Sequence, residues 1–227
     1  MEPSRSAVDR AGKRIRKRSQ VGLAPLEEDL AIVAAFRSLF IPGFSLLERM
    51  LKLTVEKLTT VLAPEIDVTE EALNIAYRPK TSDAIVAKLC RSTTSLSTMQ
   101  DIAGGRIVVP TVATQEGVTS GFIQGIAGAT GSRPSVKDTT EHGDELGYRA
   151  VHIVFQFGGR PVEIQIRTAR QQQWAQTVEN VDQSLGTDLK HGNGPEEWLE
   201  WLLELSKGLR EQDLGLSAEL PLPPSEL

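Results

Sequence analysis

The stretch AVHIVFQFGGRPVEIQIRT, residues 150–168, decides the fold. It holds two runs of alternating apolar and polar residues, separated by the dipeptide Gly158-Gly159. Strand side chains point alternately to opposite faces, and a Gly-Gly pair suits a two-residue hairpin turn. The stretch therefore predicts an antiparallel hairpin with strands at Ala150–Phe157 and Pro161–Arg167.

The two strands carry polar side chains that share the face opposite the core. In the second strand these are a carboxylate, an amide and a guanidinium in one row: Glu163, Gln165 and Arg167. The first strand adds His152 and opens on Tyr148 and Arg149. Aromatic and guanidinium groups stack on bases, and arginine and histidine bind phosphate oxygens. Exposed polar faces are common on antiparallel sheets, so the row alone does not separate a site from a solvated surface.

Apolar residues at helical spacing predict helices around this hairpin. The expected helices are Leu26–Phe40, Phe44–Leu62, Ala84–Leu89, Thr111–Ala127, Ala169–Val181 and Pro195–Glu211. We expect Pro42-Gly43 to interrupt the first two and Pro64 to end the second. A buried strand is expected at Arg106–Pro110, followed by a loop-rich segment over Gly125–Lys137.

Composition and charge narrow the class of protein. The chain has 227 residues, 40% of them hydrophobic, which is enough for a real core. A single cysteine, Cys90, excludes an internal disulfide and a cysteine-built zinc site. We see no apolar run of bilayer-spanning length, so a cytoplasmic protein without membrane association is expected.

The net charge is divided between a basic start and an acidic remainder. The first twenty residues hold seven basic and two acidic side chains, whereas the whole chain has a net charge of -5. An acidic body does not suit a dedicated nucleic-acid binder. The basic start is expected to be a solvated, disordered arm.

Two further segments carry groups that nucleotide chemistry requires. Asp101-Ile102-Ala103-Gly104-Gly105-Arg106 places an acid before an apolar strand, with glycines that permit close backbone approach. Asp101 and Glu163 together suit Mg²⁺, which takes carboxylate and phosphate oxygens. The cations ahead of them suit a triphosphate and the charge that develops in phosphoryl transfer: Arg78, Lys80 and Lys88. Each of these groups taken singly is more often a surface ion pair.

In order and approximate spacing, these segments resemble the RelA/SpoT synthetase domain. The resemblance covers about Leu46 to Val181. It rests on Arg78-Pro79-Lys80 with Lys88, Asp101-Ile102-Ala103-Gly104-Gly105-Arg106, Gly147-Tyr148-Arg149-Ala150-Val151-His152, Glu163-Ile164-Gln165-Ile166-Arg167-Thr168 and Trp174-Ala175. The Gly-Tyr-Arg and Glu-Ile-Gln-Ile-Arg-Thr elements together are highly specific, whereas either alone is moderately so.

The resemblance implies an α+β fold, a nucleotidyltransferase-like mixed sheet flanked by helices. It implies a small alarmone synthetase of the stringent response, which transfers the pyrophosphate of ATP to the ribose 3′-hydroxyl of GDP, GTP or GMP and releases AMP. Asp101 is then a Mg²⁺ ligand, and Glu163 ligates the metal or draws the proton from the 3′-hydroxyl. The residues implied to bind ATP are Arg78, Lys80, Lys88 and Arg106. Those implied for the acceptor are Tyr148, which stacks on guanine, His152 near the phosphates, Arg149, Gln165, Arg167 and Lys137.

Three departures from the family pattern leave the acceptor open. Thr139-Thr140 replace a Tyr-Ile pair after Lys137-Asp138, Ala84 replaces a serine, and Asp144-Glu145 stand where a Pro-Lys pair is usual. Acids repel a polyphosphate. These departures leave three candidate acceptors: a guanine nucleotide, an adenine nucleotide or, as in toxic relatives, the 3′ end of tRNA. A third reading is an inactive nucleotide-binding protein, against which the retention of Asp101 and Glu163 argues.

The expected organisation has three parts. Residues 1–25 are a disordered basic tail, 26–190 a synthetase domain with its N-terminal helices, and 191–227 a C-terminal helix with a disordered tail. The chain has no His-Asp dipeptide and little sequence before Leu46, so synthesis without hydrolysis is expected. The apolar terminal helices and the family resemblance favour a homo-oligomer, by resemblance a tetramer.

Overall fold

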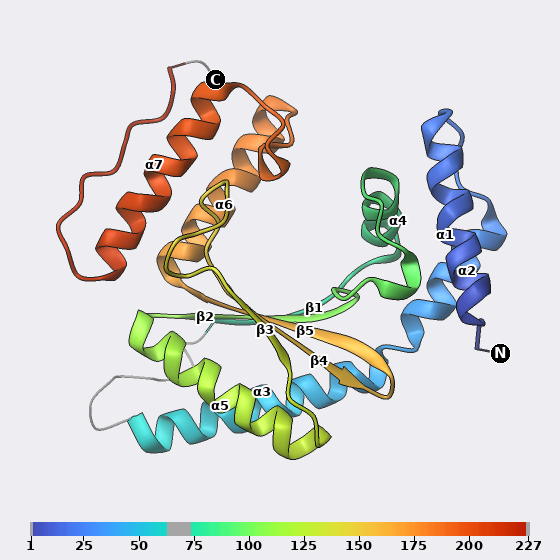
Figure 1. Ribbon diagram of the computed structural model, residues 1–227, viewed down its shortest axis with the longest axis horizontal. Helices are drawn as coiled ribbons and strands as arrows, with labels where there is room; N and C mark the ends of the chain where they lie inside the picture. The colour runs from blue at the N-terminus through green and yellow to red at the C-terminus, as the bar shows by residue number, and fades with distance from the viewer. Residues whose placement is uncertain (1, 63–73, 226–227) are drawn as a thin grey trace.

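The computed structural model describes residues 2–62 and 74–225. Within them, one mixed sheet has the strand order β1-β2-β5-β4-β3 (Figure 1). Its strands are β1 (Asn74–Pro79), β2 (Ala103–Val109), β3 (Ser135–Asp138), β4 (Val151–Phe157) and β5 (Arg160–Thr168). β2 and β5 run parallel, and the other neighbouring strands are antiparallel. The expected α+β class with a mixed sheet is confirmed.

Helices pack on both faces of this sheet. They are α1 (Arg5–Gln20), α2 (Glu27–Ser38), α3 (Ile41–Leu62), α4 (Ser82–Arg91), α5 (Val112–Thr130), α6 (Ala169–Leu185) and α7 (Glu196–Asp213), with short 3-10 helices η2 (Leu96–Thr98) and η3 (Leu189–His191). α3 and α5 cover one face (Figure 1). On the other face, α6 with α7 stands at one end and α4 with α1 at the other (Figure 1). The two groups of helices on that face therefore come from distant parts of the sequence.

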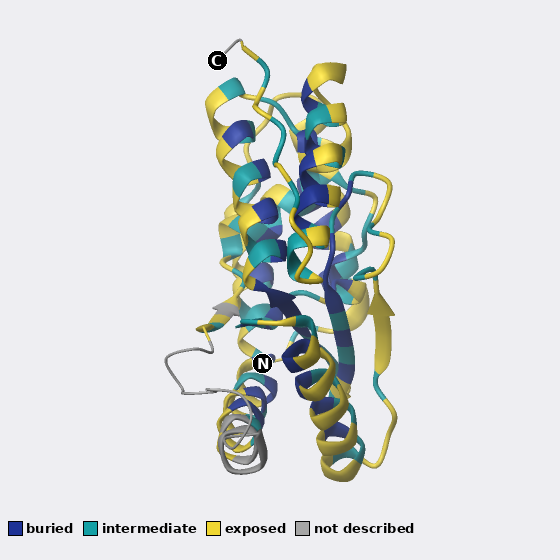
Figure 2. Ribbon diagram, turned by 90° about the vertical axis from the view of Figure 1, so that its left-hand side faces the viewer, coloured by how far each residue is buried: buried dark blue, intermediate teal, exposed yellow. Residues whose placement is uncertain are grey.

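The predicted hairpin is confirmed as β4 and β5, which pair antiparallel. Its turn needs glycine, because Gly158 and Gly159 have φ of 56° and 73°, a region that other residues avoid. The apolar residues of β5 are fully buried against the core: Val162, Ile164 and Ile166. Figure 2 shows the buried strands between exposed helix faces. The polar row of β5 consequently lies on the face away from α3 and α5.

Glycine also sets how closely β2 approaches α3. A Cβ on Gly105 would lie 3.0 Å from Cδ2 of Leu47, which is fully buried. Leu51, one turn further along α3, would lie 3.6 Å from the same Cβ. The absence of a side chain therefore lets β2 pack closely against α3.

The basic N-terminal segment is a packed helix, so the expectation of a disordered arm is wrong for Arg5–Gln20. Val8, Ala11 and Ile15 are fully buried. Arg16 donates hydrogen bonds from Nε to the carbonyl oxygen of Leu89 at 3.0 Å and from a terminal nitrogen to that of Thr94 at 2.6 Å.

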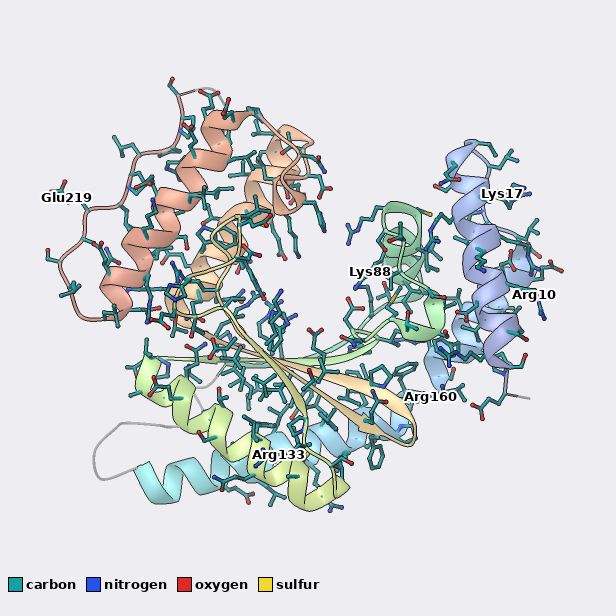
Figure 3. The ribbon with its side chains drawn as sticks, viewed as in Figure 1. Arg10, Lys17, Lys88, Arg133, Arg160 and Glu219 are labelled. Carbon is teal, nitrogen blue, oxygen red and sulfur yellow. The ribbon has the colours of Figure 1, made fainter. Side chains whose placement is uncertain are left out.

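The many arginine and lysine residues of α1 make its apolar stripe hard to recognise in the sequence. Its buried residues recur at helical spacing, while cations such as Arg10 and Lys17 lie on the exposed side (Figure 3). Asp9 reaches inward instead and accepts hydrogen bonds from the hydroxyls of Ser95 and Ser97 at 2.6 and 3.0 Å. α1 therefore supports the segment that leads to Asp101.

Replacing Ile15 by alanine tests whether α1 is part of the folded core. The change removes a fully buried side chain, so we expect the free energy of unfolding to fall by about 2–5 kcal/mol. Lys13→Ala, on the exposed side of the same helix, is expected to change it by less than about 0.5 kcal/mol. Urea unfolding followed by circular dichroism measures both. Equal midpoints for the two variants would show that the helix contributes nothing to stability.

The α2–α3 region differs from the sequence prediction in two ways. Pro42 and Gly43 lie in the first turn of α3, where proline is tolerated because it lacks only an N–H that has no intrahelical partner. The helical stretch Glu27–Thr54 is also long and apolar enough to span a bilayer by length and composition, contrary to expectation. Part of its apolar surface, including Phe36 and Leu47, is buried in the core. Pro64 lies outside the described residues.

The C-terminal segment after α7 packs against the helices as far as Pro221, where a disordered tail was expected. Trp201 Nε1 donates a hydrogen bond to the carbonyl oxygen of Pro221 at 3.0 Å, and Leu220 packs against the α6–α7 apolar cluster. The sequence reading also missed β1 and placed a loop where β3 lies. β3 is an edge strand whose four residues are all exposed, so it carries no apolar alternation.

Candidate active site

A cavity of about 980 Å³ lies over the polar face of the sheet, between α4 and α6. On its α4 side it is lined by Lys80, Asp101 and Arg106. Toward α6 and the hairpin it is lined by Lys137, Tyr148, His152, Glu163, Gln165 and Arg167. One cavity thus gathers most of the side chains that the sequence singled out, from five separate segments.

Asp101 binds two lysine side chains on the α4 side of the cavity. Its Oδ2 accepts hydrogen bonds from Nζ of Lys80 at 2.7 Å and from Nζ of Lys88 at 2.8 Å. Burial raises the pKa of this carboxyl, but the hydrogen bonds from Lys80 and then Lys88, with their charges, outweigh it and lower the pKa below its usual value. Asp101 is therefore ionised at neutral pH and holds two cations at the cavity wall.

The chain path explains why these three groups meet. β1 ends at Pro79, and the N–H of Lys80 still pairs with the carbonyl oxygen of Ile102 at 3.0 Å. Thr81 then caps α4, and its hydroxyl accepts the N–H of Ala84. Lys88 lies two turns into α4 and extends toward the sheet, as Figure 3 shows. The strand end and the helix therefore place both lysines on one carboxylate.

The carboxylates of this cavity fit a magnesium ion. The Oδ1 atom of Asp101 is buried and accepts no hydrogen bond from any described residue. A buried carboxylate oxygen without a partner is costly, and a cation would satisfy it. Glu163 lies on the neighbouring strand, paired in register with Gly104. Mg²⁺ is usually held by one or two carboxylates together with substrate phosphates, and Asp101 and Glu163 both line this cavity.

Four side chains form a continuous hydrogen-bonded chain on the side of the cavity toward the hairpin. Glu163 Oε1 lies 2.6 Å from Nδ1 of His152, and Nε2 of His152 lies 2.9 Å from the hydroxyl of Tyr148. Arg167 donates to the same hydroxyl at 2.7 Å. We name this set, Glu163, His152, Tyr148 and Arg167, the tyrosine–histidine chain. It connects an aromatic ring with a carboxylate on the adjacent strand.

Tyr148 is held in place from several sides. The guanidinium carbon of Arg167 lies 4.9 Å from its ring centroid, and the Trp174 ring lies 6.2 Å away. Burial raises the pKa of its phenol despite the nearby charge of Arg167, so the hydroxyl stays protonated. An aromatic group fixed in this way suits stacking with a base.

Asp144, one of the two acids near Tyr148, has a structural role. Asp144 Oδ1 accepts the backbone N–H groups of Leu146 at 3.0 Å and of Tyr148 at 2.9 Å. Gly147 between them has φ of 87°, and a Cβ there would lie 2.8 Å from that of Ser206 on α7. Asp144 therefore shapes the turn that presents Tyr148. Its charge is partly offset by these N–H groups, which weakens the objection that acids at this position repel an anionic acceptor.

Other predicted residues lie elsewhere or are only partly described. Arg149 is buried and points toward α7, where it donates to the hydroxyl of Ser206 at 3.2 Å and to the carbonyl oxygen of Thr140 at 2.9 Å. It lies outside the lining of the cavity, so the structure gives it a structural position and not the acceptor contact expected for it. Arg78 lies on β1 opposite Gly104, but its side chain is outside the described set. Lys137 is exposed on β3, opposite His152.

The cavity also contains residues that the sequence reading missed. Arg91 lines it, three residues beyond Lys88 on α4, so helical periodicity offered a signal for it. Lys190 and His191 line it from η3, a short element with no sequence signature. Gln172 accepts a hydrogen bond from Arg167 at 2.9 Å and fixes that guanidinium.

Comparison with known proteins agrees with this geometry. Residues 77–182 match the model for a region found in RelA/SpoT proteins. The chain carries a RelA/SpoT region. The matched residues contain every member of the tyrosine–histidine chain, both lysines on Asp101 and Asp101 itself.

The RelA/SpoT region has relatives among both sequences and structures. Uncharacterized proteins of Mycobacterium bovis and Mycobacterium tuberculosis are 34% identical over 126 residues, which are 55% of this chain and 45% of theirs. This chain thus spans less than half the length of those relatives. The small alarmone synthetase 1 of Bacillus subtilis, solved with its product pppGpp, is 25% identical with a TM-score of 0.58, covering 78% of this chain and 92% of that one. A Streptococcus mutans protein, 20% identical with a TM-score of 0.53, shares the fold and covers 78% of this chain and 89% of that one.

Proposed function

We propose that this chain is a (p)ppGpp synthetase that transfers the pyrophosphate of ATP to the ribose 3′-hydroxyl of GDP or GTP and releases AMP. One observation carries the proposal. A lysine-bound carboxylate, Asp101, and a histidine-bound carboxylate, Glu163, border the same cavity, with a fixed aromatic ring at its other end. Phosphoryl transfer needs positioned charge, and acceptor selection needs a surface for the base.

The reaction divides between the two ends of the cavity. Lys80 and Lys88 would supply the cations for the β- and γ-phosphates of ATP. Asp101 with Glu163 would hold Mg²⁺, which would neutralise charge on those phosphates. The 3′-oxygen of the acceptor attacks the β-phosphorus of ATP, and the bond from that phosphorus to the α–β bridging oxygen breaks. Glu163 accepts the proton of the 3′-hydroxyl, and AMP leaves with the bridging oxygen.

Guanine as the acceptor base is supported by three facts. Tyr148 supplies a ring held by Arg167 and Trp174. Asp144, the acid that argued against a polyphosphate acceptor, binds the backbone of the Tyr148 turn. The B. subtilis synthetase with the related fold binds pppGpp. We also propose a cytoplasmic homo-oligomer that synthesises without hydrolysing, following the sequence reading.

An acceptor panel with ATP labelled on the γ-phosphate tests the proposal. We expect the label to move to GDP or GTP and AMP to appear in equal amount. We also expect EDTA to abolish both, because the proposed reaction uses Mg²⁺. Adenine nucleotides and deacylated tRNA serve as the competing acceptors. Label transfer to tRNA alone, or no AMP with any guanine nucleotide, would overturn the proposal.

A further inference from the structure

A neutral His152 gives the tyrosine–histidine chain a consistent set of hydrogen-bond directions. The Arg167 guanidinium has no acceptor atom, so it donates to the Tyr148 oxygen. With a neutral imidazole, Nε2 of His152 accepts the Tyr148 hydroxyl hydrogen at 2.9 Å. His152 therefore carries its hydrogen on Nδ1 and donates it to Glu163 Oε1 at 2.6 Å. A neutral imidazole in the Nδ1–H tautomer fits every contact, with no donor facing a donor.

We propose that the Tyr148 hydroxyl and His152 are positioning residues that transmit acceptor binding to Glu163, an inference that rests on the proposed function. The Tyr148 ring contacts the acceptor base, while Glu163 acts on the ribose of the same molecule. The hydrogen bonds between them fix which carboxylate oxygen faces the substrate, because Oε1 is already engaged by His152. His152 thus acts on Glu163, a role in addition to the contact near the acceptor phosphates that family resemblance implied.

The surroundings of the chain make it stiff enough to transmit position. Asp144 and Ser206 hold the backbone around Tyr148, since Asp144 accepts its N–H and the Ser206 hydroxyl donates to the Gly147 carbonyl oxygen. His152 and Glu163 stand on adjacent strands, where β4 and β5 are paired along their length. The Glu163 and His152 side chains are only 14% and 20% exposed, so water competes little for their hydrogen bond. A shift of the Tyr148 ring therefore reaches Glu163 through two hydrogen bonds.

Tyr148→Phe tests the transmission because it keeps the ring and removes the hydroxyl. We expect the KM for the acceptor to stay within about threefold and kcat to fall by about tenfold, the effect of one lost hydrogen bond in a buried network. The matched control is Tyr77→Phe, which removes the hydroxyl of the protein's other tyrosine. Tyr77 feels the charges of Glu48 and Lys52 on α3, across the sheet from the cavity, and its variant should match wild type. Equal losses in kcat and in acceptor affinity for Tyr148→Phe would overturn the proposal.

Two substitutions of His152 separate its nitrogens. The amide nitrogen of asparagine lies near the position of Nδ1 and that of glutamine near Nε2. His152→Asn therefore keeps a donor for Glu163, whereas His152→Gln does not. We expect His152→Asn to retain a kcat about tenfold above that of His152→Gln. Equal rates for the two variants would contradict the assigned role.

A spectroscopic measurement tests the geometry without any activity. The protein has three histidines, so imidazole ¹⁵N shifts at one fixed alkaline pH resolve them, and His152→Gln assigns the signal. We expect the Nδ1–H tautomer for His152 in the nucleotide-free protein, and loss of that preference in Tyr148→Phe. An Nε2–H tautomer in the wild type would overturn the proposal. If the tautomer is as expected and no transferase activity is found, the proposed function fails while the hydrogen-bond chain stands.

Discussion

Replacing Glu163 by glutamine is expected to lower kcat by about 10²–10⁴-fold while nucleotide binding is largely kept. Glutamine has the same shape and keeps an oxygen that accepts the His152 N–H, but it has no negative charge and is too weak a base to take the 3′-hydroxyl proton. The fold should be unaffected, because the polar face of β5 loses only a charge. Single-turnover rates of AMP formation measure the loss.

The matched control for this variant is Glu145→Gln. Glu145 is exposed and lies outside the cavity lining, so removing its charge should leave kcat within about twofold of wild type. Equilibrium dialysis with GDP separates a catalytic defect from lost binding. A Glu163→Gln variant with the wild-type rate would remove this carboxylate from the chemistry.

Asp101→Asn is the second large effect expected, a fall of at least about 100-fold in kcat/KM for ATP. The amide removes the charge that holds Lys80 and Lys88 at 2.7 and 2.8 Å and weakens the proposed metal site. Charge stabilisation by a bound metal is worth several kcal/mol, so a loss of this size follows. The activity should also need more Mg²⁺ for half-saturation.

Asp83→Asn controls for the loss of one acid near α4. Asp83 is exposed in the first turn of α4 and contributes nothing to the cavity lining. Its variant should keep both the rate and the Mg²⁺ dependence of wild type. If Asp101→Asn retained activity within about threefold, the lysine-bound carboxylate would be structural only.

The hairpin was predictable because its physics is local. Strict alternation of apolar and polar residues, with Gly158-Gly159 between the runs, fixes both the register and the face of each side chain. Placing Glu163 and His152 on the same face follows from that alternation alone. Their contact does not, because it depends on the rotamers of two side chains on neighbouring strands.

The N-terminal helix and β3 were missed for opposite reasons. In α1, cations outnumber apolar residues, so composition suggested a solvated arm. Four buried positions decide its packing: Val8, Ala11, Gly12 and Ile15. In β3, no residue is buried, so pairing with β4 alone defines the strand. Both elements depend on partners distant in sequence, which local pattern does not reveal.

The sequence predicted most of the residues that line the cavity but was less reliable about what each side chain contacts. Asp101, Lys80 and Lys88 come together as motif resemblance implied. Arg149, adjacent to Tyr148, instead points toward α7, where it donates to the hydroxyl of Ser206. Lys190 and His191 approach the cavity only through the fold of η3 against α6.

Identification of the reaction products by ³¹P NMR tests the central claim most directly. With ATP, GDP and Mg²⁺, we expect AMP and a guanosine carrying diphosphates at both the 5′ and 3′ positions, in equal amounts. This result requires transfer of the β,γ-pyrophosphate as one unit. Formation of ADP with a single added phosphate, or of inorganic phosphate alone, would contradict the account.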